Sequence, residues 1–155
     1  MTMTLPGQRS PSAWWFPASY VAHAAEEYCC GETFPVWISR LAHVQFSATA
    51  FLWLNGIALG AMIVAAWFAT HREPFRLLTT TLATIVTING TAHVVGSLAT
   101  AGYSPGVVTG AVWWLPLGVV TLRRGRGELA RGAFATGIAL GVIAHAVVSA
   151  IVIAS

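Results

Sequence analysis

The segment His23-Ala24-Ala25-Glu26-Glu27 brings one imidazole and two carboxylates together within five residues. On a helix, positions i, i+3 and i+4 lie on one face, so these three side chains point the same way. The chain has only five acidic residues, all of them Glu, and two are adjacent here between apolar flanks. Neighbouring carboxylates in apolar surroundings cannot both stay ionised unless a cation compensates them. The segment therefore predicts a site that binds either a metal ion or a proton.

The overall composition indicates a membrane protein. Hydrophobic residues make up 56% of the 155 residues and charged residues 8%, whereas soluble domains contain about 25% charged residues. All eight basic residues are Arg, and a net charge of +3 confined to short connections does not predict nucleic-acid binding. The adjacent Cys29 and Cys30 are poorly placed for a structural disulfide and leave the redox compartment open.

The elements that must position the site are helices long enough to cross a bilayer, which takes about 20 apolar residues each. We predict an all-α, polytopic transmembrane helical bundle, a single domain over residues 1–155 with a cytoplasmic tail at 1–11. The first span is the weakest because it contains Pro17, His23 and both glutamates, so four spans plus an interfacial helix is the alternative. The five predicted spans are approximately 12–30, 45–70, 77–101, 106–122 and 132–154.

The distribution of Arg predicts the orientation. The connection at 71–76 holds Arg72 and Arg76, and the connection at 123–131 holds four more Arg. By the positive-inside rule both connections are cytoplasmic. The N-terminus then lies inside and the C-terminus outside, in a multi-pass membrane protein.

Polar residues from four predicted spans fall at one level in the outer half of the membrane. At 1.5 Å per residue, His93 lies roughly 12 Å, His145 about 14 Å and Asn55 about 15 Å from the outer ends of their spans. Asn89 lies one turn below His93 on the same face. Intramembrane ionisable residues are rare and usually functional, whereas Asn55 and Asn89 are expected to support the site by interhelical hydrogen bonds.

Three histidines and two glutamates form a typical ligand set for Fe, Zn or Mn. We predict a divalent transition metal held by His23, His93, His145 and either Glu26 or Glu27. The remaining glutamate is then a candidate general base, or orients a ligand.

The motif Tyr103-Ser104-Pro105-Gly106 predicts a tight turn at the outer side. Pro105 and Gly106 suit the central positions of a type II turn, because Pro fixes φ and Gly supplies the positive φ. Tyr103 is a candidate to cap the site, which makes it a candidate catalytic residue beside Glu26 and Glu27.

These motifs resemble the HXXEE-domain family of small bacterial integral membrane proteins. The resemblance rests on His23 to Tyr28, on Phe34-Pro35-Val36-Trp37 and on the Tyr103-Ser104-Pro105-Gly106 (YxPG) motif. His93 is the best match to another His of the family, and His145 to a further C-terminal one. The resemblance covers most of the chain and implies the membrane class and the choice of site residues. It implies no reaction, because the activity of the family is not established.

The expected function is a metal-dependent membrane enzyme that acts on a lipophilic small molecule among membrane lipids. A proton-coupled or metal-ion transporter is one alternative, and a haem- or quinone-binding accessory subunit is another. Small-residue faces at Gly56/Gly60 and Gly137/Gly141 serve either helix packing or a homo-oligomer, and the sequence does not distinguish the two.

Overall fold

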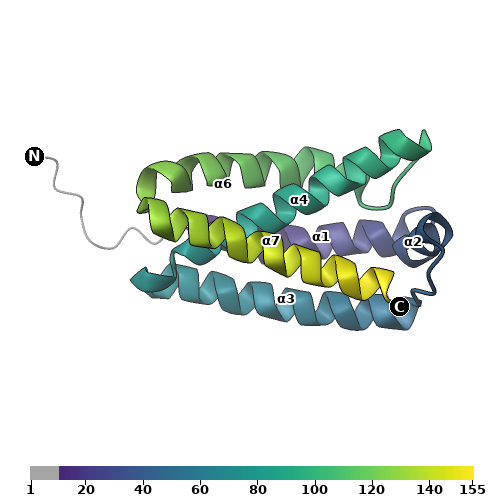
Figure 1. Cartoon of the computed structure of the whole chain (residues 1–155), viewed down its shortest axis with the longest axis horizontal. Helices are drawn as coiled ribbons and strands as arrows, with labels where there is room; N and C mark the ends of the chain where they lie inside the picture. Colours follow the sequence, from purple (N-terminus) through teal and green to yellow (C-terminus); the bar gives the residue numbers. More distant parts are fainter. Residues whose placement is uncertain (1–10) are drawn as a thin grey trace, which may run out of the picture.

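The computed structural model describes residues 11–155, and the part of the chain that it describes is built from helices without strands (Figure 1). The predicted tail therefore lies almost wholly outside the described residues. The elements, in chain order, are η1 (Pro11–Trp14), α1 (Trp15–Cys29), α2 (Phe34–Ala42), α3 (Ala48–His71), η2 (Glu73–Phe75), α4 (Leu77–Thr100), α5 (Val107–Thr109), the π-helical turn η3 (Gly110–Trp114), α6 (Leu115–Glu128) and α7 (Arg131–Ile153).

Three helical segments are long and apolar enough to cross a membrane: Ala48–His71, Glu73–Thr100 and Arg131–Ile153. The predicted count of five spans is not confirmed. The first predicted span corresponds to α1, which has 15 residues and carries His23, Glu26 and Glu27. The fourth corresponds to α5, η3 and α6, which follow one another without a break and end in three arginines on the last turns of α6.

The long helices run side by side, with α4 packed against α3, α6 and α7 (Figure 1). Two glycines let α7 approach α4 closely. A Cβ atom at Gly137 would lie 2.8 Å from the Leu77 carbonyl oxygen, and one at Gly141 would lie 2.8 Å from that of Thr81. This small-residue face therefore serves packing within the chain. Gly56 and Gly60 on α3 face open space instead.

Helix α2 lies across one end of the bundle, where Figure 1 shows it nearly end-on. The sequence analysis treated residues 31–44 as a connection and missed this helix. Its start has a local signal, because Thr33 is the N-cap residue in an extended conformation and Pro35 sits in the first turn, where proline is favoured. Phe34, Trp37 and Ile38 line a cavity beneath α2.

The π-helical turn η3 follows from Pro116, which has no N–H to donate to the carbonyl group of Val112. The N–H of Leu115 donates to the carbonyl oxygen of Gly110, five residues back, which widens the turn. Here the helix also approaches α4, because a Cβ atom at Gly90 would lie 2.9 Å from the Gly110 oxygen. The widened turn thus sits where two glycines bring the helices together.

The Arg-rich connections meet at the end of the bundle away from α2. Arg76 lies 3.5 Å from Glu73 and 3.8 Å from Glu128, which joins the α3–α4 connection to the end of α6. At the other end, the N–H of Gln45 donates to the carbonyl oxygen of Ser155. The two Arg-rich connections thus lie at one end of the described bundle, and residues 45 and 155 lie together at the other.

Candidate metal centre

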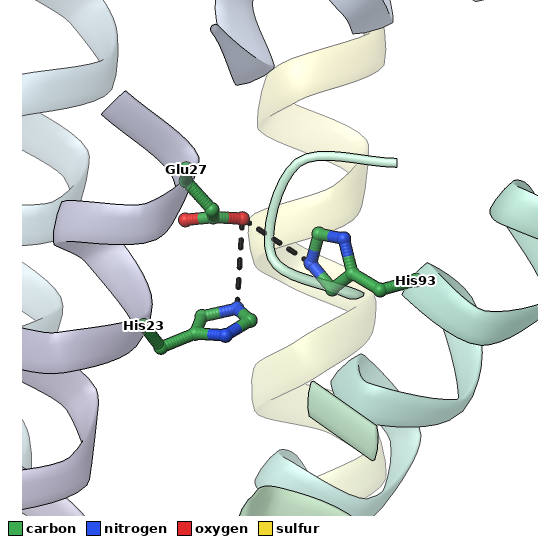
Figure 2. Close-up of side chains that lie close together, drawn as sticks. All are labelled: His23, Glu27 and His93. Atoms are coloured by element: carbon green, nitrogen blue, oxygen red, sulfur yellow. Dashed lines mark ion pairs between the residues drawn. The ribbon is translucent and has the colours of Figure 1, made fainter. Parts of the chain in front are cut away.

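The candidate site is centred on one carboxylate oxygen. His23 and Glu27 lie one turn apart on α1, with His23 Nε2 3.6 Å from Glu27 Oε1. α4 brings His93 Nε2 to 3.2 Å from the same oxygen. Figure 2 shows both imidazole rings turned toward this carboxylate. All three side chains are buried, and their ligand atoms lie within 4.8 Å of one another.

His23 is held firmly on both sides of its ring. Its Nδ1 lies 2.7 Å from Thr109 Oγ1, and the ring stacks on the indole of Trp114 at a centroid distance of 3.7 Å. Trp114 is itself fixed, because its Nε1–H donates to Ser19 Oγ at 3.1 Å. The other ring nitrogen, Nε2, is buried and has no hydrogen-bond partner among the described residues. The ring is thus positioned while one of its nitrogens stays free.

Glu26 occupies a different environment from its neighbour Glu27. Its carboxylate accepts hydrogen bonds from the hydroxyl of Tyr103 at 2.8 Å and from the backbone N–H groups of Val108 at 2.9 Å and Thr109 at 2.7 Å. The Thr109 hydroxyl donates to it as well. Glu26 therefore ties α1 to the start of α5. Burial, followed by the hydrogen bond to Glu26, raises the pKa of Tyr103, which keeps this phenol protonated as a donor.

These hydrogen bonds fix the tautomer of His23. Since backbone N–H groups only donate, the Glu26 carboxylate acts as the acceptor and takes the single hydroxyl proton of Thr109. Thr109 Oγ1 must then accept from His23 Nδ1–H, which leaves a lone pair on Nε2. That lone pair is directed at the oxygen of Glu27. The ring of His93 is oriented in the same way: its Nδ1 lies 3.4 Å from Ser104 Oγ, and its Nε2 faces Glu27.

The predicted turn is present and closes the site with backbone. The N–H of Val107 donates to the Ser104 carbonyl oxygen at 2.9 Å, and Gly106 has φ +91° and ψ −2°, as the third residue of a type II turn requires. A Cβ atom at Gly106 would lie 2.7 Å from His23 Cε1 and 3.0 Å from His93 Cε1. Only glycine fits this position, both by conformation and by space.

A cavity of about 500 Å³ adjoins the cluster. Asn55, Asn89 and His145, the other residues predicted for the site, all line it. Both amide atoms of Asn55 are hydrogen bonded: its Oδ1 accepts from the Tyr20 hydroxyl at 2.6 Å, and its Nδ2 donates to the Phe51 carbonyl oxygen. Asn89 Oδ1, in contrast, is buried without a partner among the described residues.

The structure thus brings together only part of the ligand set predicted from the sequence. Among the described residues, the cluster of metal-ligand atoms contains His23, Glu27 and His93 but neither Glu26 nor His145. Tyr103 reaches the site only through Glu26. The sequence analysis missed Thr109, because its role depends on how the turn at Gly106 folds and no spacing pattern reveals it. Ser104 and Gly106 belonged to the predicted turn, but nothing in the sequence connected them with the histidines.

The three residues fit a divalent metal ion. Ligand atoms at 2.0–2.1 Å from a tetrahedral Zn²⁺ are about 3.3 Å apart, and the nitrogen–oxygen distances of 3.2 and 3.6 Å bracket this separation. Two imidazoles and one carboxylate form the donor set of catalytic zinc sites, and also of non-haem iron sites with open positions. The free Nε2 of His23 supports the same assignment, because a buried nitrogen without a partner is costly.

A protein-family model described as "Protein of unknown function with HXXEE motif" matches residues 14–121. The matched region contains the three clustered residues, Glu26 and the turn, and it ends before α7. No curated protein matches the chain. No solved structure matches it either.

Proposed function

Because this chain belongs to the HXXEE family, whose function is unknown, we propose a function from its own site: a metal-dependent membrane enzyme that acts on a lipophilic substrate. His23, Glu27 and His93 hold one divalent ion, which is Fe, Zn or Mn. The observation that carries the proposal is the convergence of three buried ligand atoms, one of them the unpartnered Nε2 of His23, beside a largely apolar cavity.

Each residue of the site has a distinct task in this proposal. A bound metal would polarise a substrate oxygen or activate a water molecule. Glu27 supplies the anionic ligand, and Glu26 with Thr109 holds His23 in the tautomer that can bind a metal. Tyr103 supports Glu26 through its hydroxyl group. His145 lines the cavity without belonging to the ligand cluster, which suits it to exchange a proton with the substrate.

The finer membrane arrangement is part of the proposal. Five helices cross the bacterial inner membrane: α3, α4 and α7, together with α1 and the continuous helix over 107–128. The N-terminus is cytoplasmic and the site lies nearer the outer face. This assignment is supported by the Arg-rich connections, which gather at the end of the bundle away from α2.

An enzyme accounts for the site better than the alternatives. A transporter needs a polar path to the opposite side. Among the described residues, however, the buried polar side chains toward the Arg-rich end are hydroxyl groups such as those of Thr80 and Thr84, among the apolar Met62, Ala66 and Leu82. Two haem ligands would have to face each other across a porphyrin. The rings of His23 and His93 are instead only 5.0 Å apart, at 74° to each other, and both face Glu27.

Metal analysis of the purified protein tests the proposal. We expect about one Fe, Zn or Mn ion per chain, and at least a tenfold loss of affinity in His23→Ala, His93→Ala and Glu27→Gln, because each substitution removes one of three protein ligands. His71→Ala is the control, since His71 lies exposed at the end of α3. The proposal fails if the protein neither retains nor takes up a divalent metal while its helix content and melting temperature are normal.

A further inference from the structure

The cavity beside the metal centre is polar at its deep end and apolar toward α2. At the deep end it is lined by Asn55, Asn89 and His145, and toward α2 by Trp37, Ile38 and Leu41. Along α4 the lining runs from Asn89 to Ala99, which are ten residues apart, or about 15 Å of helix. Glu27 and His93 form part of the wall between the two ends. A ligand that matches this gradient has one polar head and one hydrocarbon chain.

The deep end contains an unsatisfied hydrogen-bond acceptor. Asn89 Oδ1 is buried and has no partner among the described residues, although Asn55, which lines the same cavity, has partners for both its amide atoms. A buried carbonyl oxygen without a donor is costly, so a donor is expected to fill the place. The hydroxyl or amide group of a ligand would supply one.

The charges around the cavity restrict the head group further. The chain has no Lys, and among the described residues no Arg lines the cavity. Its acidic residue is Glu27, whose Oε1 lies 3.6 Å from His23 Nε2 and 3.2 Å from His93 Nε2. In the metal-free site an anionic head group would therefore lie near a carboxylate in apolar surroundings without a protein cation to stabilise it. With the divalent ion bound, a cationic head group would instead be repelled by that ion.

Resting on the proposed function, we infer that the cavity binds a single-chain amphiphile with an uncharged, hydrogen-bond-donating head group, of which a long-chain alcohol is the simplest example. The head donates to Asn89 Oδ1 next to the metal centre, and the chain extends along α4 toward α2. The 15 Å of lining is comparable with an extended dodecyl chain. The cavity volume of about 500 Å³ falls within the range of small-molecule sites.

Photo-crosslinking with chain-labelled amphiphiles tests this inference. The probes are diazirine-bearing analogues of dodecanol, dodecanoate and dodecylamine, applied to the full-length protein in lipid nanodiscs, with a chelator and again with Zn²⁺. With the chelator we expect the alcohol to label peptides that line the cavity, and unlabelled dodecanol to compete. Dodecanoate should label these peptides at least fivefold less than the alcohol with the chelator, and dodecylamine at least fivefold less than the alcohol with Zn²⁺.

Two variants, each with a matched control, locate the ligand. Asn89→Leu should lower labelling by the alcohol by about five- to tenfold, the effect of one lost hydrogen bond. Thr91→Ala on the exposed face of α4 should have no effect, because its hydroxyl bonds only to the carbonyl oxygen of Thr87. Ala58→Trp, which fills the cavity from α3, should abolish labelling, whereas Ala61→Trp on an exposed part of the same helix should not.

Each outcome decides the inference. Equal labelling by the alcohol and dodecanoate with the chelator, or by the alcohol and dodecylamine with Zn²⁺, overturns the assignment of an uncharged head group. Labelling confined to exposed residues such as Trp53 and Ile57 overturns the cavity as the binding site. The metal content of the same samples is measured separately, and Glu27→Gln should lose metal while it still takes up the alcohol. A failure of the metal proposal is thereby distinguished from a failure of the ligand assignment.

Discussion

At the scale of single residues, Glu26 and Glu27 show how adjacent carboxylates acquire different roles. Successive helical residues point about 100° apart, so Glu27 faces the two histidines while Glu26 faces the turn and the start of α5. Glu26 accepts hydrogen bonds from three residues, and Glu27 is left to face the imidazoles. The motif thus combines one residue of the candidate metal site, Glu27, with a residue that positions another, Glu26.

The hydroxyl of Thr109 is expected to set the metal affinity without touching the metal. Thr109→Val keeps the shape but removes the group that accepts from His23 Nδ1–H, so His23 can adopt the other tautomer. We expect a loss of metal affinity of about 10- to 100-fold, as for other substitutions behind metal ligands. Thr109→Ser should retain wild-type affinity in the same metal titration. If Thr109→Val binds metal as the wild type does, the hydrogen-bonded chain from Glu26 to His23 does not act as described.

At the scale of elements, the turn at 103–106 holds α4 and the helix over 107–128 around the site. Gly106 has a left-handed backbone conformation, and its backbone packs closely against both histidine rings. The π-helical turn follows after α5, so Pro116 and Gly106 together determine which residues of this helix face α1. The site therefore depends on two backbone irregularities as much as on its ligands.

Gly106→Ala is expected to disrupt the site through both conformation and space. The left-handed conformation costs a non-glycine residue about 1–3 kcal/mol, and the new Cβ atom would lie 2.7 Å from His23 Cε1. We expect a lower melting temperature and a loss of metal in the same variant. Gly102→Ala is the matched control, because its nearest neighbour would be 3.7 Å away and its φ is not positive. Normal metal binding by Gly106→Ala would contradict the close packing.

At the scale of the whole molecule, the chain combines an apolar exterior with a polar interior near one end. The exposed side chains of α3 include Trp53, Ile57 and Val64, whereas His23, Glu26 and Glu27 are buried. This inverts the usual arrangement of a soluble protein and suits a lipid environment. The cluster and the cavity lie toward the α2 end of the bundle, and the Arg-rich connections lie at the other.

The proposed orientation predicts which cysteines react in intact cells. Cys29 and Cys30 are free and exposed, at the end of α1 near α2. If this end faces outward, a membrane-impermeant maleimide should label them before the cells are lysed. Arg124→Cys in a Cys29→Ser/Cys30→Ser background should be labelled only after lysis. The reverse pattern would show that the Arg-rich end faces outward.

Much of this architecture was accessible from sequence, because hydropathy and helical periodicity are local. The boundaries predicted for the second, third and fifth spans lie within three residues of α3, α4 and α7. The proximity of His23 and Glu27 follows from their i, i+4 spacing. The inclusion of His93 in the predicted site follows from its depth along its span. Helix α2 was missed because it is short and lies across the bundle. The separation of Glu26 from Glu27, and the part played by Thr109, depend on contacts between distant segments that no local pattern encodes.

The polar contacts of α1 also bear on how the protein is made. Glu26 finds its partners 77 to 83 residues further along the chain, which a ribosome adds in roughly 4–16 s at 5–20 residues per second. During that interval α1 has emerged with two carboxylates and a histidine whose partners do not yet exist. If α1 spans the membrane as proposed, we therefore expect the translocon to release it into lipid only after the helix over 107–128 has followed, so that α1 is assembled later than helices synthesised after it.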